Sequence, residues 1–527
     1  MTEQILVTLL GRSGWAVVNS YHAIMLETDF RPNRIVLMYE AQFEESVKPV
    51  IEGIRVIQEK QKMQPVEKIR IPDFDMLAAR DATKQVVETL KKSNSEIALD
   101  ITGGRKALVS GSLMGFSGVP LKHIFYLTIE STKGAAKPYL MIPKRVQLLR
   151  DLKQNLECRK DQIITTGKEW EGFEISKEDL TVILNYAYKK DVSLVIRNPL
   201  LNIDLLEIDL PHTEVRMLVD RDTYSKNLVK HTNSDWDYPN YSQLRSSICY
   251  SGLVDYRSGD EFRHFFIDEY RRHRNPRSGL GRWYISLDSN LFYNGFVSCL
   301  ESLMAANQIH KGELLFVTSE GVIQEIDKKI SRKYKEAQID KAKNATSRNA
   351  RHLFDQFYNR NTLETRIAKM ASNQLHLLME QPTHEKANCD PLPHDSEEAD
   401  RVIVESLSKF ATEKQATVTL LSADLHMEDH CKNAGNLGWF ILEPANEIPQ
   451  VMKASDSEIL NLIMSLSVLN GVVTLDKIGH IYGDYGGQKS DNYVSKAKIF
   501  FDSVHRAKTL ENQIEKCKKL LGLGIAS

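Results

Sequence analysis

Apolar runs alternate with amphipathic segments through the N-terminal part of the chain. The runs cover residues 4–11, 34–40, 66–74, 96–104 and 121–130. Each run predicts a buried strand, and the segments between them carry apolar residues at helical spacing. Near-continuous apolar strands separated by helices are typical of a parallel sheet that is covered on both faces. We therefore predict a Rossmann-like α/β domain over residues 1–147, with ligands beyond the carboxyl ends of its strands.

The same alternation returns at Trp283 and continues to about residue 450. Strands are predicted at 284–288, 313–318, 417–424 and 439–444. A long polar helical stretch and a loop interrupt them at about 328–390. The pattern predicts a second α/β domain over residues 281–450, with a helical insertion.

Two further regions have less regular patterns. Residues 148–280 form a mixed connector, in which we predict a helix at 177–190 and strands at 192–196 and 214–219. Residues 451–527 contain three short segments that each begin with a Ser, Thr or Asp typical of helix caps. They predict a terminal helical module, which is either winged-helix-like or a helical lid on the preceding domain.

The composition changes this picture little. The chain has 527 residues, is 42% hydrophobic and 26% charged, and carries a formal net charge of −1. Its length suggests roughly three to five domains, and its balanced charge means that any nucleic-acid surface is local. The six scattered cysteines favour free thiols over disulfides or a zinc ribbon. Because we find neither a signal peptide nor an apolar run long enough to span a bilayer, we expect a cytoplasmic protein.

A Gly-Gly loop, Thr102–Lys106, follows the predicted strand that ends at Asp100. Two glycines let a ligand approach the backbone, and amides at the start of the next helix attract anions. The loop therefore predicts phosphate binding, but it lacks the GK[ST] sequence that would predict ATP hydrolysis. A tight strand–helix turn would explain one glycine without a ligand, but not the whole set.

This segment resembles the D-x-T-G-G-x-K motif of CARF domains, the CRISPR-associated Rossmann-like sensors, and the resemblance covers about residues 1–145. The loop Gly11–Trp15 occupies the position of their other ligand loop. The resemblance implies a homodimer that binds a cyclic oligoadenylate at its two-fold axis, where a symmetric ring suits a symmetric dimer. Arg105 departs from the commoner small residue of the motif. The implied ligand contacts are Arg12, Ser13, Thr102, Gly103, Gly104, Arg105 and Lys106.

Carboxylates stand at the predicted strand ends of the second α/β domain. Asp288 and Asp424 each end an apolar run and precede a helix. A strand-end Asp is often only the N-cap of the next helix, and this is the better interpretation for either residue alone. Two of them in one α/β domain favour a site, because the carboxyl ends of parallel strands share one edge. Asp429 is interpreted as a solvated helix residue.

Clustered carboxylates repel one another, so without a cation at least one would be pushed toward its protonated form. Mg²⁺ or Mn²⁺ removes this conflict, since both ions prefer oxygen ligands. Such ions supply a hydroxide near neutral pH and stabilise the charge of an in-line displacement at phosphorus. The acids therefore predict a metal-dependent phosphodiesterase.

Four segments between Trp283 and Pro444 resemble the successive motifs of PIN-domain nucleases: ISLDSNLFY, TSEGVIQEI, EADRVIVESL and TLLSADLHMEDHCKNAG. The insertion makes the chain atypical of that family. Asn290 would be a polar neighbour of the site. The resemblance implies that the catalytic, metal-binding acids are Asp288, Glu325, Asp400 and Asp424. The residues that compete with Asp400 for its role are Asp395, Glu397 and Glu398.

Two weaker patterns accompany the acids. His426 and His430 have zinc-ligand spacing, but without an HExxH motif or a cysteine pair we interpret them as surface residues. A basic cluster lies directly before the strand that carries Asp288. Such a cluster is usually only a solvated linker, but its position before that strand favours contact with a phosphate backbone. Its nucleic-acid-binding residues are Arg271, Arg272, Arg274 and Arg277.

The sequence thus predicts a cyclic-oligoadenylate-activated, metal-dependent ribonuclease of type III CRISPR antiviral defence, which cleaves single-stranded RNA. Residues 148–280 and the basic cluster would transmit activation, which requires that the ligand favour one domain arrangement over another. Two alternatives stay open. One is a non-enzymatic transcriptional regulator whose C-terminal helices read DNA, and the other is a ring nuclease that degrades the cyclic messenger itself.

Overall fold

The computed structural model describes residues 3–526 except 59–65, 91–94, 131–135, 159–171, 189–192, 231–235, 276, 278, 347, 349, 394, 487 and 489–492. The chain divides into two compact units. Unit 1 comprises residues 1–168, 178–192 and 503–527, and unit 2 comprises residues 169–177 and 193–502. None of the helices in the described residues is long and apolar enough to cross a membrane.

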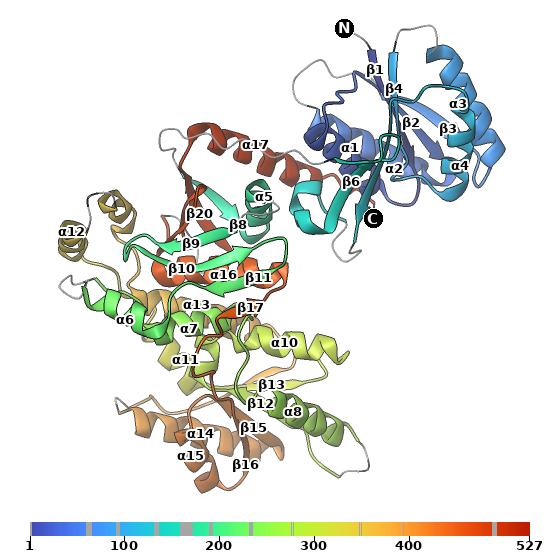
Figure 1. The fold of residues 1–527 in the computed structure, drawn as a ribbon. Coiled ribbons are helices and arrows are strands. Elements are labelled where there is room, and N and C mark those ends of the chain that lie inside the picture. Colours follow the sequence, from blue (N-terminus) through green and yellow to red (C-terminus); the bar gives the residue numbers. More distant parts are fainter. Residues whose placement is uncertain are drawn as a thin grey trace. The chain divides into compact units, whose positions relative to one another are not determined.

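Unit 1 is built on a seven-stranded sheet with the order β3-β2-β1-β4-β5-β6-β7 (Figure 1). Its strands are β1 (Glu3–Leu10), β2 (Arg34–Glu40), β3 (Val66–Ile71), β4 (Ser95–Asp100), β5 (His123–Ile129), β6 (Gln147–Asp151) and β7 (Leu156–Cys158). The first five are parallel, which confirms the strands predicted from the apolar runs. β6 and β7 join antiparallel, so the sheet continues beyond the predicted boundary at residue 147.

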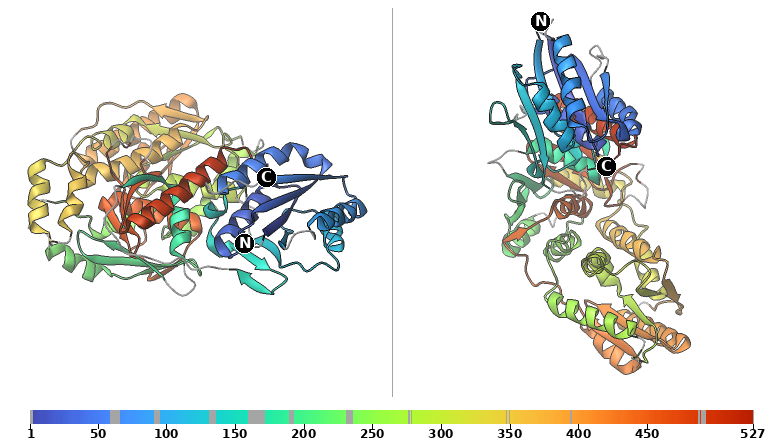
Figure 2. Two further views of the ribbon diagram at one scale, coloured as in Figure 1. Left: turned by 90° about the horizontal axis from the view of Figure 1, so that it is seen from above. Right: turned by 90° about the vertical axis from the view of Figure 1, so that its right-hand side faces the viewer.

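Unit 1 also contains helices. They are α1 (Gly14–Glu27), α2 (Glu44–Ile57), α3 (Met76–Leu90), α4 (Lys106–Gly115), α5 (Lys177–Ala187) and α17 (Val504–Leu521). α3 and α4 pack together over one face, where their apolar residues share a core with alternate residues of β1 and β2. The C-terminal end of the chain returns to this unit, since the amide of Gly14 donates to the carbonyl of Ala526 at 3.1 Å (Figure 2).

Unit 2 contains a five-stranded parallel sheet with the order β14-β13-β12-β15-β16. Its strands are β12 (Trp283–Leu287), β13 (Leu315–Ser319), β14 (His384–Ala387), β15 (Thr417–Ser422) and β16 (Leu437–Ile441). Four of them were predicted, whereas β14 lies in what we expected to be a loop. The sequence HEKA of β14 has no apolar run, and as an edge strand it has only one neighbour to pair with.

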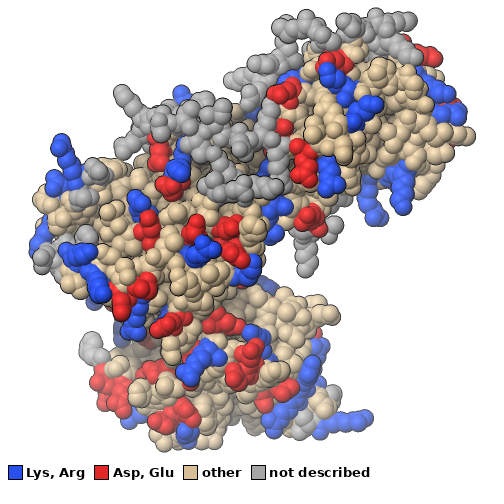
Figure 3. Space-filling view, in the orientation of Figure 1, with Lys and Arg blue, Asp and Glu red and all other residues tan. Residues whose placement is uncertain are grey.

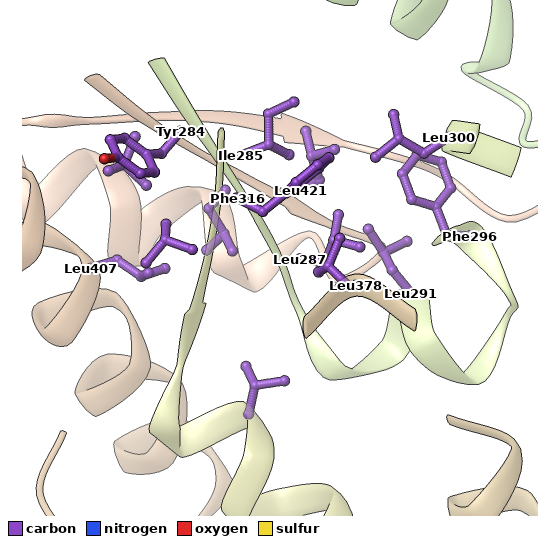
Figure 4. Packing of buried hydrophobic residues seen from close by; sticks show 14 of the residues in the cluster. Tyr284, Ile285, Leu287, Leu291, Phe296, Leu300, Phe316, Leu378, Leu407 and Leu421 are labelled. Atoms are coloured by element: carbon purple, nitrogen blue, oxygen red, sulfur yellow. The ribbon is translucent and has the colours of Figure 1, made fainter. Parts of the chain in front are cut away.

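The central strand of this sheet is β12, between β13 and β15. All five of its residues are buried, and they form a core with residues of the flanking helices (Figure 4). Leu287 lies beside Leu291 and Leu378, which come from the helices on that face. A side chain that follows Leu287 is therefore fixed at the middle of the carboxyl edge.

The helices of unit 2 surround its two sheets. They are α6 (Arg221–Lys230), α7 (Tyr241–Tyr250), α8 (Gly259–Arg274), α9 (Ser289–Tyr293), α10 (Phe296–Ala306), α11 (Glu320–Asp327), α12 (Glu336–Ala345), α13 (Leu363–Met379), α14 (Ser396–Lys414), α15 (His426–Ala434) and α16 (Asp456–Asn470). α12, α13 and a 3-10 helix (Arg351–Phe357) occupy much of the predicted insertion.

The second sheet of unit 2 is antiparallel, with the order β17-β11-β10-β9-β18-β19-β20-β8. Its strands are β8 (Phe173–Ser176), β9 (Leu194–Asn198), β10 (Ile203–Asp209), β11 (Glu214–Met217), β17 (Val451–Lys453), β18 (Val472–Leu475), β19 (Gly479–Tyr482) and β20 (Lys496–Phe501). The predicted helix and strands of the connector correspond to α5, β9 and β11, and β10 was missed.

The prediction of three helices in residues 451–527 is wrong. The first predicted helix is present as α16, where Ser455 and Glu458 form a capping box, but the next two segments contain β18, β19 and β20. The β-branched pair Val472 and Val473 and the alternating burial of β20 favour strands, which pair with β9 and β8. Helix-capping residues therefore misled the prediction, and the described part of this segment forms neither the winged-helix-like module nor a helical lid.

Candidate active site

Asp288 lies at the carboxyl end of β12 and is both a helix cap and a buried acid. Its Oδ1 accepts a hydrogen bond from the amide of Ser289 at 2.6 Å, so it caps α9. Its Oδ2 accepts from Asn290 Nδ2 and from Ser422 Oγ, each at 2.7 Å. Only 3% of Asp288 is exposed, which makes it the most deeply buried of the four predicted acids.

Two of the four predicted acids, Asp288 and Asp400, have pKa values that the charges of the other acids raise. The pKa of Asp288 is raised to about 7, mainly by burial. The carboxylates of Glu325 and Asp400 contribute to this rise, and the hydrogen bonds from Ser422 and from the amide of Ser289 oppose it. Burial likewise raises the pKa of Asp400 to about 6, with Asp424 and Glu325 as the neighbouring negative charges. The structure thus brings together the ends of β12 and β15 with one residue each from α11 and α14.

Asp424 is joined to Asp288 through a shared hydroxyl. The amide of Asp424 donates to Ser422 Oγ at 2.9 Å, and Ser422 Oγ in turn donates to Asp288. Asp424 Oδ1 accepts from the amide of His426 at 2.9 Å. This hydroxyl bridge was not predicted, although the sequence places Ser422 at the end of the same apolar run.

The choice among the acids near Asp400 follows from α14. Asp395 is the N-cap of this helix, and its Oδ1 accepts from the amides of Glu397 and Glu398 at 3.1 Å each. Both glutamates are exposed. Asp400, half-buried and near the other acids, is therefore the member of this group that fits the site.

Two histidines that we interpreted as surface residues lie beside this site. The positive forms of His430 and His426 lower the pKa of Asp400, against the larger effect of burial. Their spacing of four residues puts both histidines on one face of α15. This spacing is the feature of the sequence that could have predicted their position beside the acids. Asp429 on the same helix is exposed and lies 3.9 Å from Lys432 Nζ, in agreement with its interpretation as a solvated residue.

An oxygen-only donor set fits Mg²⁺ or Mn²⁺. Within the described ranges, however, no three His, Cys, Asp or Glu side chains are grouped closely enough to hold a metal ion. Glu325 Oε1 is 3.2 Å from Lys329 Nζ, so its charge is already partly compensated. The four acids lie near one another, but their side chains are not arranged as a complete set of metal ligands.

The basic cluster lies elsewhere. Arg271, Arg272 and Arg274 occupy the last turn of α8, not a linker, and Arg274 pairs with Glu313 at 2.8 Å. Glu313 precedes β13, and Arg282 precedes β12. The arginines of the basic cluster therefore lie at the amino edge of the sheet, whereas Asp288 lies at the carboxyl edge. Arg277 follows the helix and is exposed. Basic side chains gather over the end of α8 and acidic ones over α14 (Figure 3).

The Gly-Gly loop of unit 1 is organised by a second buried strand-end acid. Asp100 accepts from Thr8 Oγ1 at 2.9 Å, Ser20 Oγ at 2.8 Å and Thr102 Oγ1 at 2.7 Å. Burial raises its pKa, and these donors oppose that rise. The hydroxyl of Thr102 also accepts from the amide of Leu127 at 2.9 Å. Thr102 therefore builds the loop, and its hydroxyl has no spare donor for a ligand.

The glycines of the two loops are needed for close packing. A Cβ on Gly103 would lie 2.4 Å from the carbonyl oxygen of Leu9, and one on Gly11 would lie 2.6 Å from the carbonyl oxygen of Gly103. The loops after β1 and β4 thus touch at the point where the strand order reverses, which is where ligands bind in such sheets. Of the other predicted contacts, Arg12 and Lys106 are exposed, whereas Ser13 and Gly104 are half-buried.

Phe74 is a residue of this region that sequence reasoning missed. It has φ of 59° and is 65% exposed, although a bulky residue rarely adopts positive φ. Its amide donates to Glu40 Oε1 at 2.9 Å, and the guanidinium of Arg105 lies 4.1 Å from the centre of its ring. Glu40 Oε2 is 3.7 Å from Arg105 Nε. Together they hold an exposed aromatic ring beside the Gly-Gly loop.

The chain is therefore a two-unit α/β protein with a glycine-lined loop site in one unit and an acidic strand-end site in the other. No protein-family model matches it, and no curated protein sequence matches it. Two solved structures align with most of it. Protein VC1899 from Vibrio cholerae is 11% identical, with a TM-score of 0.26, over 89% of this chain and 98% of that one. Enterococcus italicus Csm6 bound to cyclic hexa-2'-fluoro-hexa-dAMP is 10% identical, with a TM-score of 0.21, over 99% of this chain and 100% of that one. At this level of similarity, neither structure supports a conclusion about the fold or the function of either unit.

Proposed function

We propose that the chain is a metal-dependent ribonuclease of type III CRISPR defence that a cyclic oligoadenylate activates. The observation that carries the proposal is the group of acids at the carboxyl edge of the parallel sheet, where burial and neighbouring carboxylates raise the pKa values of Asp288 and Asp400. Buried acids that are destabilised by each other cost stability unless a cation or a proton compensates them. Perturbed acids at the carboxyl edge of a parallel sheet are typical of a functional site.

In the proposed reaction, the residues that would hold Mg²⁺ or Mn²⁺ through carboxylate oxygens are Asp288, Glu325, Asp400 and Asp424. Such ions supply an activated water and neutralise charge on the phosphate during in-line displacement. Asn290 and Ser422 fix the orientation of Asp288 by donating to its Oδ2. Binding requires Asp288 and Asp400 to lose their protons. It also requires side-chain movements, because the acids are not grouped as ligands.

The ligand proposal rests on the loops of unit 1. Arg12, Arg105 and Lys106 supply positive charge beside tightly packed glycine backbone, which suits a ring of phosphates. Phe74 presents a ring face that an adenine can stack on. Exposed apolar residues on and before α3 and on α4 suit burial against a second copy in a homodimer: Phe74, Met76, Leu77, Leu113 and Met114.

The experiment is incubation of the purified chain with labelled single-stranded RNA and Mn²⁺, with and without each cyclic oligoadenylate. We expect cleavage that depends on both the metal and one cyclic ligand, and that Asp288→Asn and Asp424→Asn abolish. Asp429→Asn is the matched control, since Asp429 lies on α15 near the site but is exposed. RNA that stays intact under every condition would contradict the proposal.

The same reactions separate the alternatives. A ring nuclease would degrade labelled cyclic oligoadenylate faster than RNA. A transcriptional regulator would leave RNA intact and would keep its DNA affinity in the Asp288→Asn variant.

A further inference from the structure

Unit 2 contains a cavity of about 600 Å³ next to the acidic site. This volume lies in the range of small-molecule sites. Residues from six parts of the unit line it: the segment before α7, α7 itself, the end of α9, the segment after α11, and the helices α13 and α16. None of its lining residues is among the predicted catalytic, metal-binding, ligand-binding or nucleic-acid-binding residues.

Two lining residues connect the cavity to the acids. Tyr293 ends α9, the helix that Asp288 caps, and five residues of helix span about 7 Å. Lys329 follows Glu325 by one turn, and its Nζ lies 3.2 Å from Glu325 Oε1 and 5.4 Å from the centre of the Tyr293 ring. The ammonium group therefore stands between the acidic site and the cavity, where it can pair with a phosphate.

The remaining lining has the chemistry of a base-binding site. Ile367, Met370 and Leu469 provide apolar surface, and Tyr238 adds an aromatic ring. The polar lining consists of the amides and hydroxyls of Asn240, Gln243, Ser246 and Ser247 together with the carboxylates of Asp237 and Glu364. The Glu364 carboxylate is paired with Arg332 Nη1 at 2.7 Å. Amide groups and a ring face are what proteins use to bind an unstacked nucleobase.

Ser247 gives independent support for a ligand. It is 3% exposed and lines the cavity, yet its Oγ has no hydrogen-bond partner among the described residues. A buried hydroxyl without a partner costs free energy, so such groups normally bond to water or to a ligand. The neighbouring carbonyl of Ser247 is already bonded, since it accepts from Ser465 Oγ at 3.1 Å.

We propose that this cavity is a nucleotide subsite that binds one unstacked base of the RNA. Lys329 contacts the phosphate group that lies between this base and the acidic site. The inference rests on the proposed ribonuclease function, and it gives that function a base preference at one position of the substrate. Lys329 acts here as a positioning residue.

The test is titration of the full chain, in EDTA, with each of the four ribonucleoside 5′-monophosphates and with ribose 5-phosphate. We expect at least one nucleotide to bind about 10-fold or more tightly than ribose 5-phosphate, because a base can stack on an aromatic ring and ribose 5-phosphate has no base. Ile367→Trp fills the cavity from a half-buried position on α13, and we expect it to weaken nucleotide binding about 10-fold or more. Leu377→Trp on the same helix is the control, since Leu377 is exposed and lies outside the cavity.

The inference is overturned if no nucleotide binds better than ribose 5-phosphate, or if a folded Ile367→Trp variant binds as the wild type does. Ser246→Trp, which enters the same cavity from α7, replaces Ile367→Trp if that variant does not fold. RNA cleavage measured in parallel separates the two proposals. Cleavage without nucleotide binding contradicts the subsite alone, and nucleotide binding without cleavage contradicts the ribonuclease alone.

Discussion

Asp100 and Asp288 are two buried acids that end parallel strands, one in each unit, and their surroundings differ. Asp100 is surrounded by donors from Thr8, Ser20 and Thr102. The groups besides burial that shift its pKa are all hydrogen-bond donors. Asp288 also accepts three hydrogen bonds, but two carboxylates add to the rise in its pKa.

The difference shows that a strand-end Asp can organise a loop or build a reactive site, and that its neighbours decide which. An acid whose donors saturate it stabilises a turn. An acid that lies near other acids is destabilised in its charged form, and a cation relieves this destabilisation. Changes to Asp288 and to Asp100 test this contrast directly, and a change to Phe74 tests the ligand role of the loop that Asp100 organises.

The largest effect is expected for Asp288→Asn. The variant keeps the size of the side chain but loses the negative charge, so we expect RNA cleavage to fall about 10³-fold or more. Cleavage of labelled RNA with Mn²⁺ and activator measures this. Asp429→Asn should cleave as the wild type does, and equal loss in both variants would refute the assignment.

The second prediction concerns the pH dependence of stability without divalent ions. The folded protein keeps the Asp288 proton up to about pH 7, whereas an unfolded chain loses it near 3.8. The folded state therefore binds more protons in between, and the free energy of unfolding falls as pH rises through this window. Asp288 alone should account for about 4 kcal/mol at neutral pH. Urea unfolding in EDTA at pH 5 and 7.5 measures the fall, which should be smaller in Asp288→Asn; the same fall in both proteins would contradict the assignment.

The third prediction concerns Asp100→Ala, which leaves the buried hydroxyls of Thr8 and Ser20 without their acceptor. We expect a loss of about 3 kcal/mol in the stability of unit 1, seen as faster hydrogen exchange in β1 and β4. RNA cleavage that does not require the cyclic ligand should be the same in Asp100→Ala and in the wild type. Unchanged exchange would show that Asp100 does not organise the loop.

The smallest effect is expected for Phe74→Ala. Loss of a stacking surface should weaken cyclic oligoadenylate binding about 10-fold, measured by titration calorimetry. Stability should not fall, since the ring is exposed and the backbone conformation is strained. Phe43→Ala, which removes a ring farther from Arg105 (6.0 Å), is the comparison. Equal binding by Phe74→Ala and wild type would exclude stacking on this ring.

The sequence predicted the parts of the fold that depend on strong local patterns. Apolar runs such as those of β1 and β12 form strands because burial on both faces dominates their energetics. β14 and β18–β20 were missed because short or alternating segments take their structure from the strands beside them. The acids were predicted from their places at strand ends, but the roles of Ser422, His430 and Phe74 depend on contacts between distant segments.

The most direct test of the acidic site is titration of the full chain with Mn²⁺ at pH 7.5, monitored by calorimetry. We expect saturable Mn²⁺ binding by the wild type. Asp288→Asn and Asp424→Asn should abolish or greatly weaken this binding, and Asp429→Asn should retain it. Binding should also weaken below pH 6, where protons compete for Asp288 and Asp400. Equal Mn²⁺ binding by wild type and Asp288→Asn would contradict the account.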